Sequence, residues 1–388
     1  MSTKEKKPGL FDVGFRKYTV ALFPKKERAF LMMIMGFLMI AMVAAGYPQA
    51  AMWVGFLFAA YSAVANDSIQ TIGTFIASNQ DKKWWVLWIF LGGIFLVTVG
   101  YSWVTYNGDV SYERLMSKGF AEAPTEFHFL QIAAPIMLII LTRLRMPVST
   151  TFILLTSFAT VPKAVGGVLA KSFSGYLLSF LIGLVIFLLV GRMFKRLFVG
   201  KPKGYWTYLQ WITSGTLWSV WLMQDAANIA VYLPRSLNVG QFIIFAAVVT
   251  IGLGFLLYHK GGKIQKIVLE KSNTTDVRFA TIIDFVYCII LFYFKLHSKV
   301  PMSTTWVFIG LLAGRELGMT ILSVSKNSIS STLRIIGKDF LFATLGLIIS
   351  IVIAVSVNDQ LSYDSIFTTI PEEFVKGLSK FFDRLIPS

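Results

Sequence analysis

The chain has 388 residues, of which 55% are hydrophobic and 14% are charged, and its mean hydropathy is +0.67. A soluble globular domain usually carries about a quarter charged residues, so this composition excludes an ordinary soluble domain and predicts a protein embedded in a membrane. The net charge of +16 would favour nucleic-acid binding in a soluble protein. Here the basic residues lie in short segments between apolar runs, as cytoplasmic loops of membrane proteins do. With one cysteine and three histidines, the chain is not expected to form a disulfide scaffold, a zinc site or a thiol redox site.

The first half of the chain is predicted to begin inside the cell and to cross the bilayer repeatedly. Its N-terminal segment is polar and basic and lacks a small-residue cleavage site, so we expect a cytoplasmic N-terminus without a cleaved signal. A helix needs about 20 apolar residues to cross the hydrocarbon. Predicted spans follow at 29–46, 49–81, 84–106, 128–142 and 174–191, with one further crossing by a broken segment at 147–171. The acidic loop at 107–127 suits the outer side.

The second half repeats this pattern. Spans are predicted from residue 204 onward and at 239–258, 279–296 and 333–356, with a second broken segment at 301–327. The span that begins near residue 204 is expected to be broken by polar residues at 224–228, as the span at 49–81 is at 66–70. Basic clusters at 192–203 and 260–278 are expected to lie inside, and the C-terminus is expected outside. The predicted fold is therefore all-α, a polytopic protein of the inner cell membrane with about eleven crossings.

Two polar motifs each occur twice within these apolar segments, in the same order. Ala65-Asn66-Asp67-Ser68-Ile69-Gln70 is matched by Met223-Gln224-Asp225-Ala226-Ala227-Asn228, and Pro147-Val148-Ser149-Thr150-Thr151 is matched by Pro301-Met302-Ser303-Thr304-Thr305. Asp225 follows Asp67 by 158 positions, and Ser303 follows Ser149 by 154. A weaker match pairs Lys171-Ser172-Phe173 with Lys338-Asp339-Phe340.

These matches predict an internal duplication. Each copy is predicted to cross the membrane five times, an odd number, so the second copy should be upside down relative to the first. We therefore divide the chain into an N-terminal tail with an extra first span (1–48), two inverted repeats with broken helices (49–198 and 199–356) and a C-terminal tail (357–388). Inverted repeats with interrupted helices are typical of secondary transporters, whose substrate sites lie near the bilayer midplane.

The paired aspartates are candidate ligands of a coupling cation. A carboxylate at the bilayer centre costs roughly 2.5–3.5 kcal/mol on insertion scales, so Asp67 and Asp225 need a partner or a function. We interpret them as ligands of Na⁺ or H⁺, with capping of a broken helix as the structural alternative. Asp284 is a candidate for a second cation ligand or for the partner of a lysine. The neighbouring amides can offer oxygens to a cation or N–H groups to an anion; they belong to Asn66, Gln70, Gln224 and Asn228.

The Pro-x-Ser-Thr-Thr motifs predict helix starts, because proline fixes the turn and hydroxyl groups cap exposed amides. Helix N-termini present free N–H groups and bind anions. Two such starts approaching from opposite faces could surround an oxyanion, and ordinary capped helix starts are the alternative. The candidate anion-binding residues are Ser149, Thr150, Thr151, Ser303, Thr304 and Thr305.

At these duplicated motifs the chain resembles the inorganic phosphate transporter (PiT) family, a group of Na⁺- or H⁺-coupled phosphate symporters. Members carry Gly-Ala-Asn-Asp-x-x-Asn and Pro-x-Ser-Thr-Thr-His in each of two inverted halves, and the resemblance covers residues 49–356. It implies that Asn66, Asp67, Asp225 and Asn228, with residues 149–151 and 303–305, line the phosphate and cation sites. The chain departs from the pattern at Gln70 and Gln224, which replace asparagines, and at Phe152 and Trp306, which stand where the family has histidine.

These features predict a secondary transporter that carries inorganic phosphate together with Na⁺ or H⁺ by alternating access. A sulfate permease of the same fold is the runner-up, and an anion channel is a further alternative. No enzyme activity is expected, because the sequence contains no His-Glu-x-x-His helix, Gly-x-Ser-x-Gly turn or nucleotide-binding loop. No cofactor is expected besides the coupling ion. The expected partners are the oxyanion and membrane lipid, without nucleic acid, and a homodimer stays open because homodimers are common among transporters.

Overall fold

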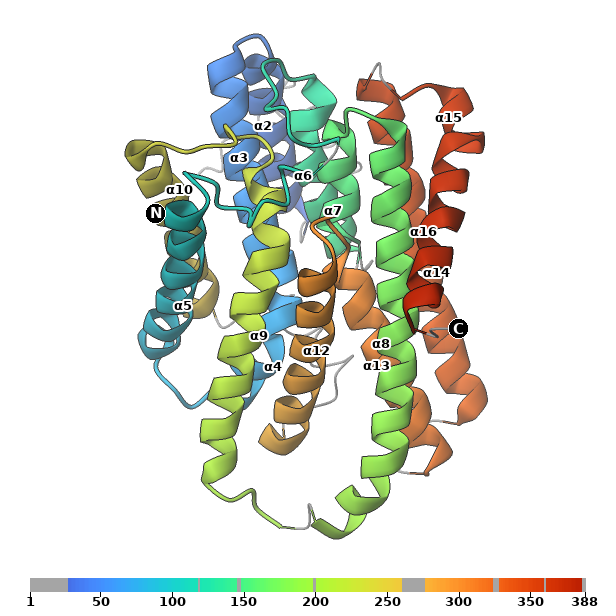
Figure 1. Cartoon of the computed structure of the whole chain (residues 1–388). Helices are drawn as coiled ribbons and strands as arrows, with labels where there is room; N and C mark the ends of the chain where they lie inside the picture. The colour runs from blue at the N-terminus through green and yellow to red at the C-terminus, as the bar shows by residue number, and fades with distance from the viewer. Residues whose placement is uncertain are drawn as a thin grey trace, which may run out of the picture.

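The computed structural model describes residues 27–117, 119–144, 148–197, 200–259, 276–323, 328–358 and 361–385. Within these ranges the regular structure is helical and contains no β-strand, so the predicted all-α class is confirmed. Figure 1 shows the helices packed side by side in one bundle.

Two sets of helices follow one another along the chain. The first set is α2 (Arg28–Ala45), α3 (Pro48–Ser62), the π-helical turn η1 (Ala63–Asp67), α4 (Ser68–Ser78), α5 (Trp84–Thr105), α6 (Phe129–Arg143), α7 (Thr150–Ile153), the 3₁₀ turn η2 (Leu155–Phe158) and α8 (Pro162–Leu197). The second set is α9 (Tyr205–Ala230), α10 (Val239–Tyr258), α12 (Val277–His297), α13 (Thr304–Ile321), α14 (Ile329–Val357), α15 (Tyr363–Phe367) and α16 (Thr369–Leu385).

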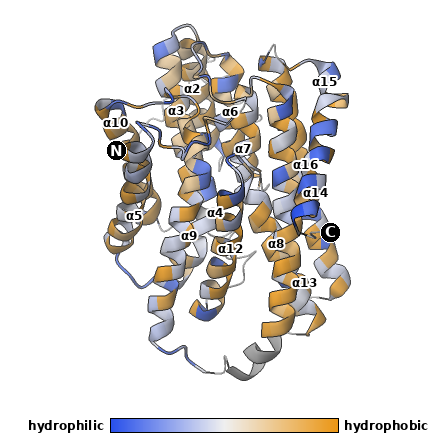
Figure 2. Ribbon diagram, in the orientation of Figure 1, coloured by the Kyte–Doolittle hydropathy of each residue, from blue (hydrophilic) through white to orange (hydrophobic). Residues whose placement is uncertain are grey.

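Among the described residues, seven helical segments are long and apolar enough to cross a membrane, and Figure 2 colours many of the residues of the long helices as hydrophobic. Large apolar side chains on them, such as Val43, Val97 and Ile251, are 68–75% exposed. Water penalises such exposure, whereas lipid does not. The chain is therefore built as a membrane protein. The seven segments are α2, Pro48–Asp67, α5, Pro162–Val190, α10, α12 and α14. The total of about eleven crossings and the inner-membrane location remain predictions.

Most predicted spans agree with the observed helices to within a few residues, the usual uncertainty of helix ends, but three predicted segments differ. The second broken segment, predicted at 301–327, contains one continuous helix, α13, from Thr304 to Ile321. Helix α8 begins at Pro162 instead of residue 174, since proline suits the first turn of a helix. Helix α9 continues through residues 224–228, where the sequence predicts a polar break. That stretch contains two alanines and no glycine or proline, so the helix is not interrupted there.

The first aspartate motif does distort its helix, because residues 63–67 form the π-helical turn η1 between α3 and α4. A π-helical turn widens a helix and is frequent at functional sites. The prediction of broken helices at both aspartate motifs is therefore wrong for the second copy, and in the first copy the interruption is a single widened turn.

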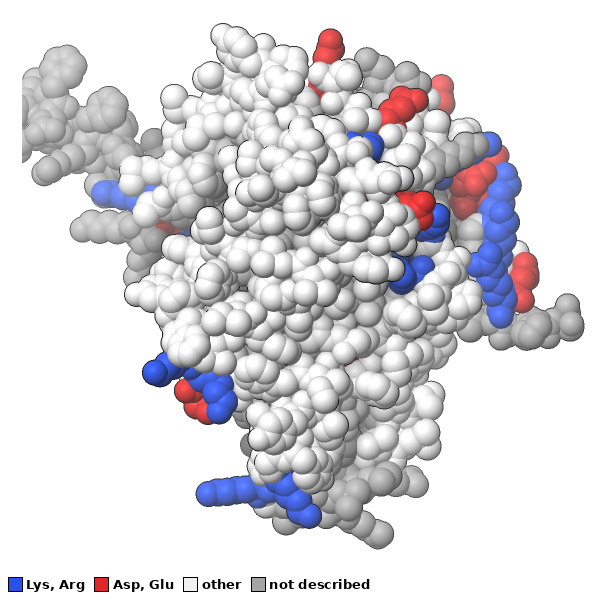
Figure 3. All heavy atoms as spheres, turned by 60° about the vertical axis from the view of Figure 1, so that its left-hand side comes forward, with Lys and Arg blue, Asp and Glu red and all other residues white. Residues whose placement is uncertain are grey.

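One end of the bundle, called here the loop end, is covered by residues 106–128. Leu237 N donates to Gly108 O and Thr160 N to Gly119 O, each at 2.9 Å, and Glu113 pairs with Lys299 at 2.6 Å. The segment therefore joins the loops that follow α9, η2 and α12. At the opposite, basic end, Figure 3 shows Lys and Arg side chains at the lower tip of the molecule. The charge pattern predicts that the basic end is cytoplasmic.

The same order of elements follows each aspartate motif. After Asp67 come α5, α6, a helix start at Thr150 and α8; after Asp225 come α10, α12, a helix start at Thr304 and α14. In Figure 1, α3 and α4 run from the upper to the lower end, whereas α9 runs from the lower to the upper end. This order favours the two inverted repeats, 49–198 and 199–356, which stay a prediction.

Close packing of α13 against α8 fixes the position of the second Ser-Thr-Thr motif. A Cβ atom at Gly310 would lie 2.4 Å from the Tyr176 carbonyl oxygen, and one at Gly314 would lie 2.0 Å from that of Phe180. Only glycine lets the two backbones approach this closely. The start of α13 is further held by α8, because Ser303 N donates to Ser172 Oγ at 2.8 Å.

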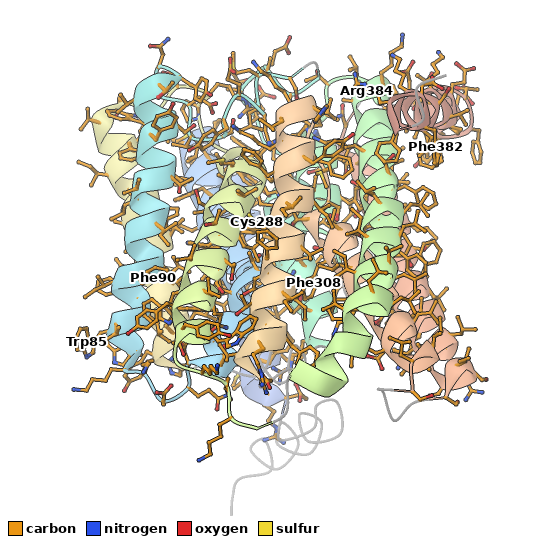
Figure 4. The ribbon with its side chains drawn as sticks, turned by 60° about the horizontal axis from the view of Figure 1, so that its bottom comes forward. Trp85, Phe90, Cys288, Phe308, Phe382 and Arg384 are labelled. Carbon is orange, nitrogen blue, oxygen red and sulfur yellow. The ribbon has the colours of Figure 1, made fainter. Side chains whose placement is uncertain are left out.

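The C-terminal tail contains α16, which packs beside α8. The rings of Phe374 and Phe173 have centroids 5.8 Å apart, and those of Phe381 and Phe294 are 6.0 Å apart. Figure 1 shows α16 beside α8, and Figure 4 shows α16 nearly end-on, with Phe382 and Arg384 near its outer end.

Candidate functional site

The four predicted motifs come together in the interior of the bundle, in what is called here the central cluster. Its members come from η1, the start of α7, α9 and the start of α13, and each is at most 6% exposed. They are Asn66, Asp67, Ser149, Thr150, Thr151, Gln224, Asp225, Asn228, Ser303, Thr304 and Thr305.

Asp67 joins the first aspartate motif to the first Ser-Thr-Thr motif. Asn66 Nδ2 donates to its Oδ1 at 2.8 Å, and Thr150 Oγ1 donates to its Oδ2. The contact spans 83 positions of the chain, and it gives both carboxylate oxygens of Asp67 a donor.

Asp225 is less completely hydrogen-bonded. Asn228 Nδ2 donates to its Oδ1 at 2.6 Å. Its Oδ2 is buried without a well-formed hydrogen bond, although the side chain of Thr304, the counterpart of Thr150, interacts with the carboxylate. Gln224 Oε1 and Asn228 Oδ1 are also buried without a donor. Their amide nitrogens point to other acceptors, such as the Leu291 carbonyl at 3.0 Å from Gln224 Nε2. Because buried polar atoms are nearly always paired, three unpartnered oxygens within about one turn of α9 favour a positively charged ligand.

Thr151 connects the two halves of the chain. Its hydroxyl donates to the Met302 carbonyl at 3.1 Å and accepts a hydrogen bond from Asn228 Nδ2 at 3.1 Å. Asp67 and Asp225 also lie close enough to interact electrostatically. Two like charges this close in the interior need a counter-charge, which a bound cation can supply.

Both Ser-Thr-Thr motifs begin helices, as predicted, but the two helices differ in length. Ser149 Oγ accepts from Phe152 N, and Ser303 Oγ accepts from Trp306 N, each at 3.2 Å. Helix α13 has 18 residues, whereas α7 has only four. The macrodipole grows from aligned peptide units, so α13 offers the stronger anion-binding start.

Thr304, the first residue of α13, is held by two aromatic side chains. Trp221 Nε1 donates to its Oγ1 at 3.3 Å, and Tyr287 OH donates to its carbonyl oxygen at 2.9 Å. Sequence analysis does not identify either aromatic residue. Trp221 precedes Asp225 by four residues and Tyr287 follows Asp284 by three, a spacing that places each pair on one helix face.

Asp284 lies in a separate polar group, nearer the basic end. Thr74 Oγ1 donates to its Oδ1 at 2.7 Å, and Ser214 Oγ donates to its Oδ2 at 2.5 Å. Its described contacts include no lysine and no member of the central cluster. Further along α4 and α9, Asn79 donates to Gln210 Oε1 at 3.1 Å, beside a pocket of about 420 Å³ whose lining includes Ser78, Asn79 and Asp276.

Three other positions singled out in the sequence have different outcomes. The side chain of Gln70 lies outside the described residues. Phe152 and Trp306, at the histidine positions of the PiT motif, contact each other edge to face with centroids 5.6 Å apart. Their rings therefore fill the space between the two Ser-Thr-Thr starts, and Trp306 Nε1 is buried without a partner.

Arg114 also reaches the central cluster, although the sequence gives no sign of it. Its Nε donates to the Met223 carbonyl at 2.9 Å, and its guanidinium interacts electrostatically with Asp225. In the part of the chain that the structure describes, no three His, Cys, Asp or Glu side chains come together as a metal site. A cation bound here would therefore take amide and hydroxyl oxygens besides carboxylates.

No family model matches the chain, and neither does any curated protein. Among solved structures, "The sodium-dependent phosphate transporter" is similar to this chain with a TM-score of 0.41 and 19% sequence identity. The similarity covers 81% of this chain and 98% of that one. A TM-score this low carries no argument about fold or substrate, so the central cluster has to be interpreted from its own residues.

Proposed function

We propose that the chain is a secondary transporter that carries an inorganic oxyanion across the membrane together with a cation. The observation that carries this proposal is the meeting of both aspartate motifs and both Ser-Thr-Thr motifs in one buried cluster, joined across the halves by Thr151. Secondary transporters bind substrate and coupling ion at the interface of two repeats. The central cluster offers both acceptors for a cation and donors for an anion.

Na⁺ is the proposed coupling ion, with H⁺ as the alternative. A proton on Asp225 would provide a donor for only one of the unpartnered oxygens of Asp225, Gln224 and Asn228. Hard metal cations bind several carboxylate and amide oxygens at once. The number of unpartnered oxygens therefore favours Na⁺, and Asp67 and Asp225 would share the role of charged ligands.

The anion is proposed to lie against the start of α13, where Thr304 and Thr305 present hydroxyl groups and the first amides carry the positive end of the helix dipole. Phosphate is the leading substrate because the motifs resemble those of the PiT family. Sulfate is the alternative, since the rings of Phe152 and Trp306 take the places of two histidines and add bulk beside the anion.

The test is uptake of labelled phosphate and labelled sulfate into proteoliposomes that contain the purified protein. An inward Na⁺ gradient at constant pH and an inward proton gradient at constant Na⁺ are applied separately. We expect one anion to accumulate above its equilibrium level when the Na⁺ gradient is present. Uptake that reaches only the equilibrium level and depends on neither gradient would indicate a channel. The absence of uptake of either anion would refute oxyanion transport.

Matched variants show whether the aspartates drive this uptake. Asp67→Asn and Asp225→Asn are expected to abolish gradient-driven accumulation. Asp109→Asn is the control, because Asp109 is 5% exposed but lies at the loop end, where its carboxylate accepts from Ser111 and Glu113. The Asp109→Asn protein is first checked to elute like the wild type in gel filtration. If it then lost as much uptake as the Asp67 and Asp225 variants, the effect would not be specific to the central cluster.

A further inference from the structure

A second group of buried charges lies on the loop-end side of the central cluster. Arg114 is 1% exposed and Lys171 is 9% exposed. Arg114 Nη1 donates to the carbonyl oxygens of Ser298 and Val300, at 3.2 Å each. Lys171 Nζ donates to the same two oxygens, at 3.2 Å to Ser298. Two buried cations thus share the same pair of neutral acceptors.

No carboxylate forms a salt bridge with either member of this pair in the described chain. Both nitrogens lie 3.2 Å from one oxygen, so they are no more than about 6.4 Å apart, twice that distance. Like charges this close repel each other in the interior, and buried Lys and Arg are normally paired with carboxylates. Asp225 interacts with Arg114 only over a longer distance.

The pair stands directly before the proposed anion site. Ser172, next to Lys171, accepts the hydrogen bond from Ser303 N at the start of α13. The residues that the pair holds, Ser298 and Val300, belong to the loop that leads from α12 into this start. An anion that moves from the loop end to Thr304 would therefore come within reach of both cations.

We propose that Arg114 and Lys171 form an anion-binding position that receives the inorganic oxyanion from the loop end before it reaches the start of α13. The inference rests on the proposed oxyanion transport. An oxyanion would supply a directly bonded negative partner, which the pair lacks, and its several oxygens can accept from a guanidinium and an ammonium group together. The competing explanation is that the pair only fixes residues 298–300 in place.

Equilibrium binding of labelled phosphate and labelled sulfate to the purified protein tests the proposal. Lys171→Gln and Arg114→Gln keep an amide donor for the carbonyl oxygens but remove the charge. We expect about ten- to hundredfold weaker binding in both, the loss associated with one charge-assisted hydrogen bond. Lys171→Arg keeps the charge and is expected to bind within about threefold of the wild type.

Two controls separate charge from structure. Lys299→Gln removes a charge from the same loop at an exposed residue that pairs with Glu113, and it is expected to leave affinity within about twofold. The thermal stabilisation by Na⁺ reports on the proposed cation ligands of α9, so it should be retained in Lys171→Gln. Arg114 binds three carbonyl groups and its variant can misfold, in which case Lys171→Gln decides.

The outcomes are distinct. Weakened binding in Lys171→Gln with rescue by Lys171→Arg supports the anion-binding position. If Lys171→Gln binds as tightly as the wild type, the pair is only a clamp on residues 298–300, and this inference is wrong while oxyanion transport stands. If the wild type binds and transports neither anion, the proposed function fails and this inference fails with it.

Discussion

Replacing Asp225 by asparagine tests whether the unpartnered oxygens of α9 form a cation site. Asp225→Asn keeps the size of the side chain, removes its charge and adds an amide donor near Asn228 Oδ1 and Gln224 Oε1, which are buried without one. It also removes the repulsion between Asp225 and Asp67, which is larger than the attraction to Arg114 that is lost with it. We therefore expect the variant to be more stable than the wild type when the cation is absent, and to gain nothing when the cation is added.

The magnitude follows from the number of unpartnered oxygens. Leaving one buried acceptor unsatisfied costs about 1–3 kcal/mol, so one new amide donor should stabilise the cation-free variant by a similar amount. A ligand at 100 times its Kd stabilises the wild type by about 2.7 kcal/mol. A domain of 150–250 residues shifts its Tm by roughly 2–4 °C per kcal/mol, and a longer chain shifts less. We expect Na⁺ to raise the Tm of the wild type by about 3–5 °C and that of the variant by less than about 1 °C.

The assay is thermal unfolding of the purified protein in detergent, followed by the fluorescence of its 10 tryptophans in NaCl and in choline chloride at equal ionic strength. Asp109→Asn is the matched control, because the oxygens of Asp109 already accept hydrogen bonds. It should lose stability and keep the response to Na⁺. If Asp225→Asn were instead destabilised without Na⁺ and still responded like the wild type, the oxygens of α9 would not be cation ligands. A Tm of the wild type that rises as the pH falls and does not change with Na⁺ would identify H⁺ as the coupling ion.

Three further substitutions test the anion site and its support. Thr150→Val removes the hydroxyl that donates to Asp67 and should lower the apparent affinity of uptake for the anion about tenfold, whereas Thr150→Ser should keep the wild-type affinity. Equal affinities in all three proteins would mean that this hydroxyl does not contribute to the site. Gly314→Ala places a Cβ 2.0 Å from the Phe180 carbonyl oxygen and should lower stability by about 1–3 kcal/mol. The control Gly337→Ala, whose Cβ meets nothing within 4 Å, should be neutral or stabilising. Similar Tm values for both variants would contradict the tight packing of α13. Trp306→Phe removes a buried N–H that has no partner and should leave anion affinity within about twofold; a larger loss would mean that the indole N–H contacts the anion.

The motifs that recur in the sequence were sufficient to predict which polar residues meet inside the bundle. The contact of Asp67 with Thr150 and the link from Asn228 to Thr151 each join an aspartate motif to a Ser-Thr-Thr motif, the two kinds of motif that the sequence assigns to one site. The sequence could not show that α9 stays continuous, since polar residues in a helix interrupt it only when their surroundings leave backbone groups unpaired. Here Gln224 and Asn228 have partners on neighbouring helices.

The positions of Arg114 and Lys171 could not be predicted for a different reason. Arg114 lies in an irregular loop, and its partners at Met223 and Val300 are 109 and 186 positions away. Neither periodicity nor a turn motif reports contacts across such distances. Lys171 belonged to a weak repeat motif, but a lysine in an apolar segment more often extends its amine to the membrane surface than to carbonyl groups inside the bundle.

Charge balance explains why an anion and a cation would cross together. Four buried groups are linked in series by electrostatic interactions: Asp67 with Asp225, Asp225 with Arg114, and Arg114 with Lys171. When all four are ionised their charges cancel, and an uncompensated charge in the interior costs several kcal/mol. An oxyanion alone would leave this series negative and Na⁺ alone would leave it positive, so both are favoured only together.

A dianion then requires two Na⁺, one for each carboxylate, whereas monoanionic phosphate requires one. The dependence of uptake on Na⁺ concentration, measured at fixed anion concentration, therefore tests this balance. A Hill coefficient near two for sulfate would agree with it. Sulfate accumulation with a single Na⁺ would show that one carboxylate of the series stays protonated or that the series does not set the stoichiometry.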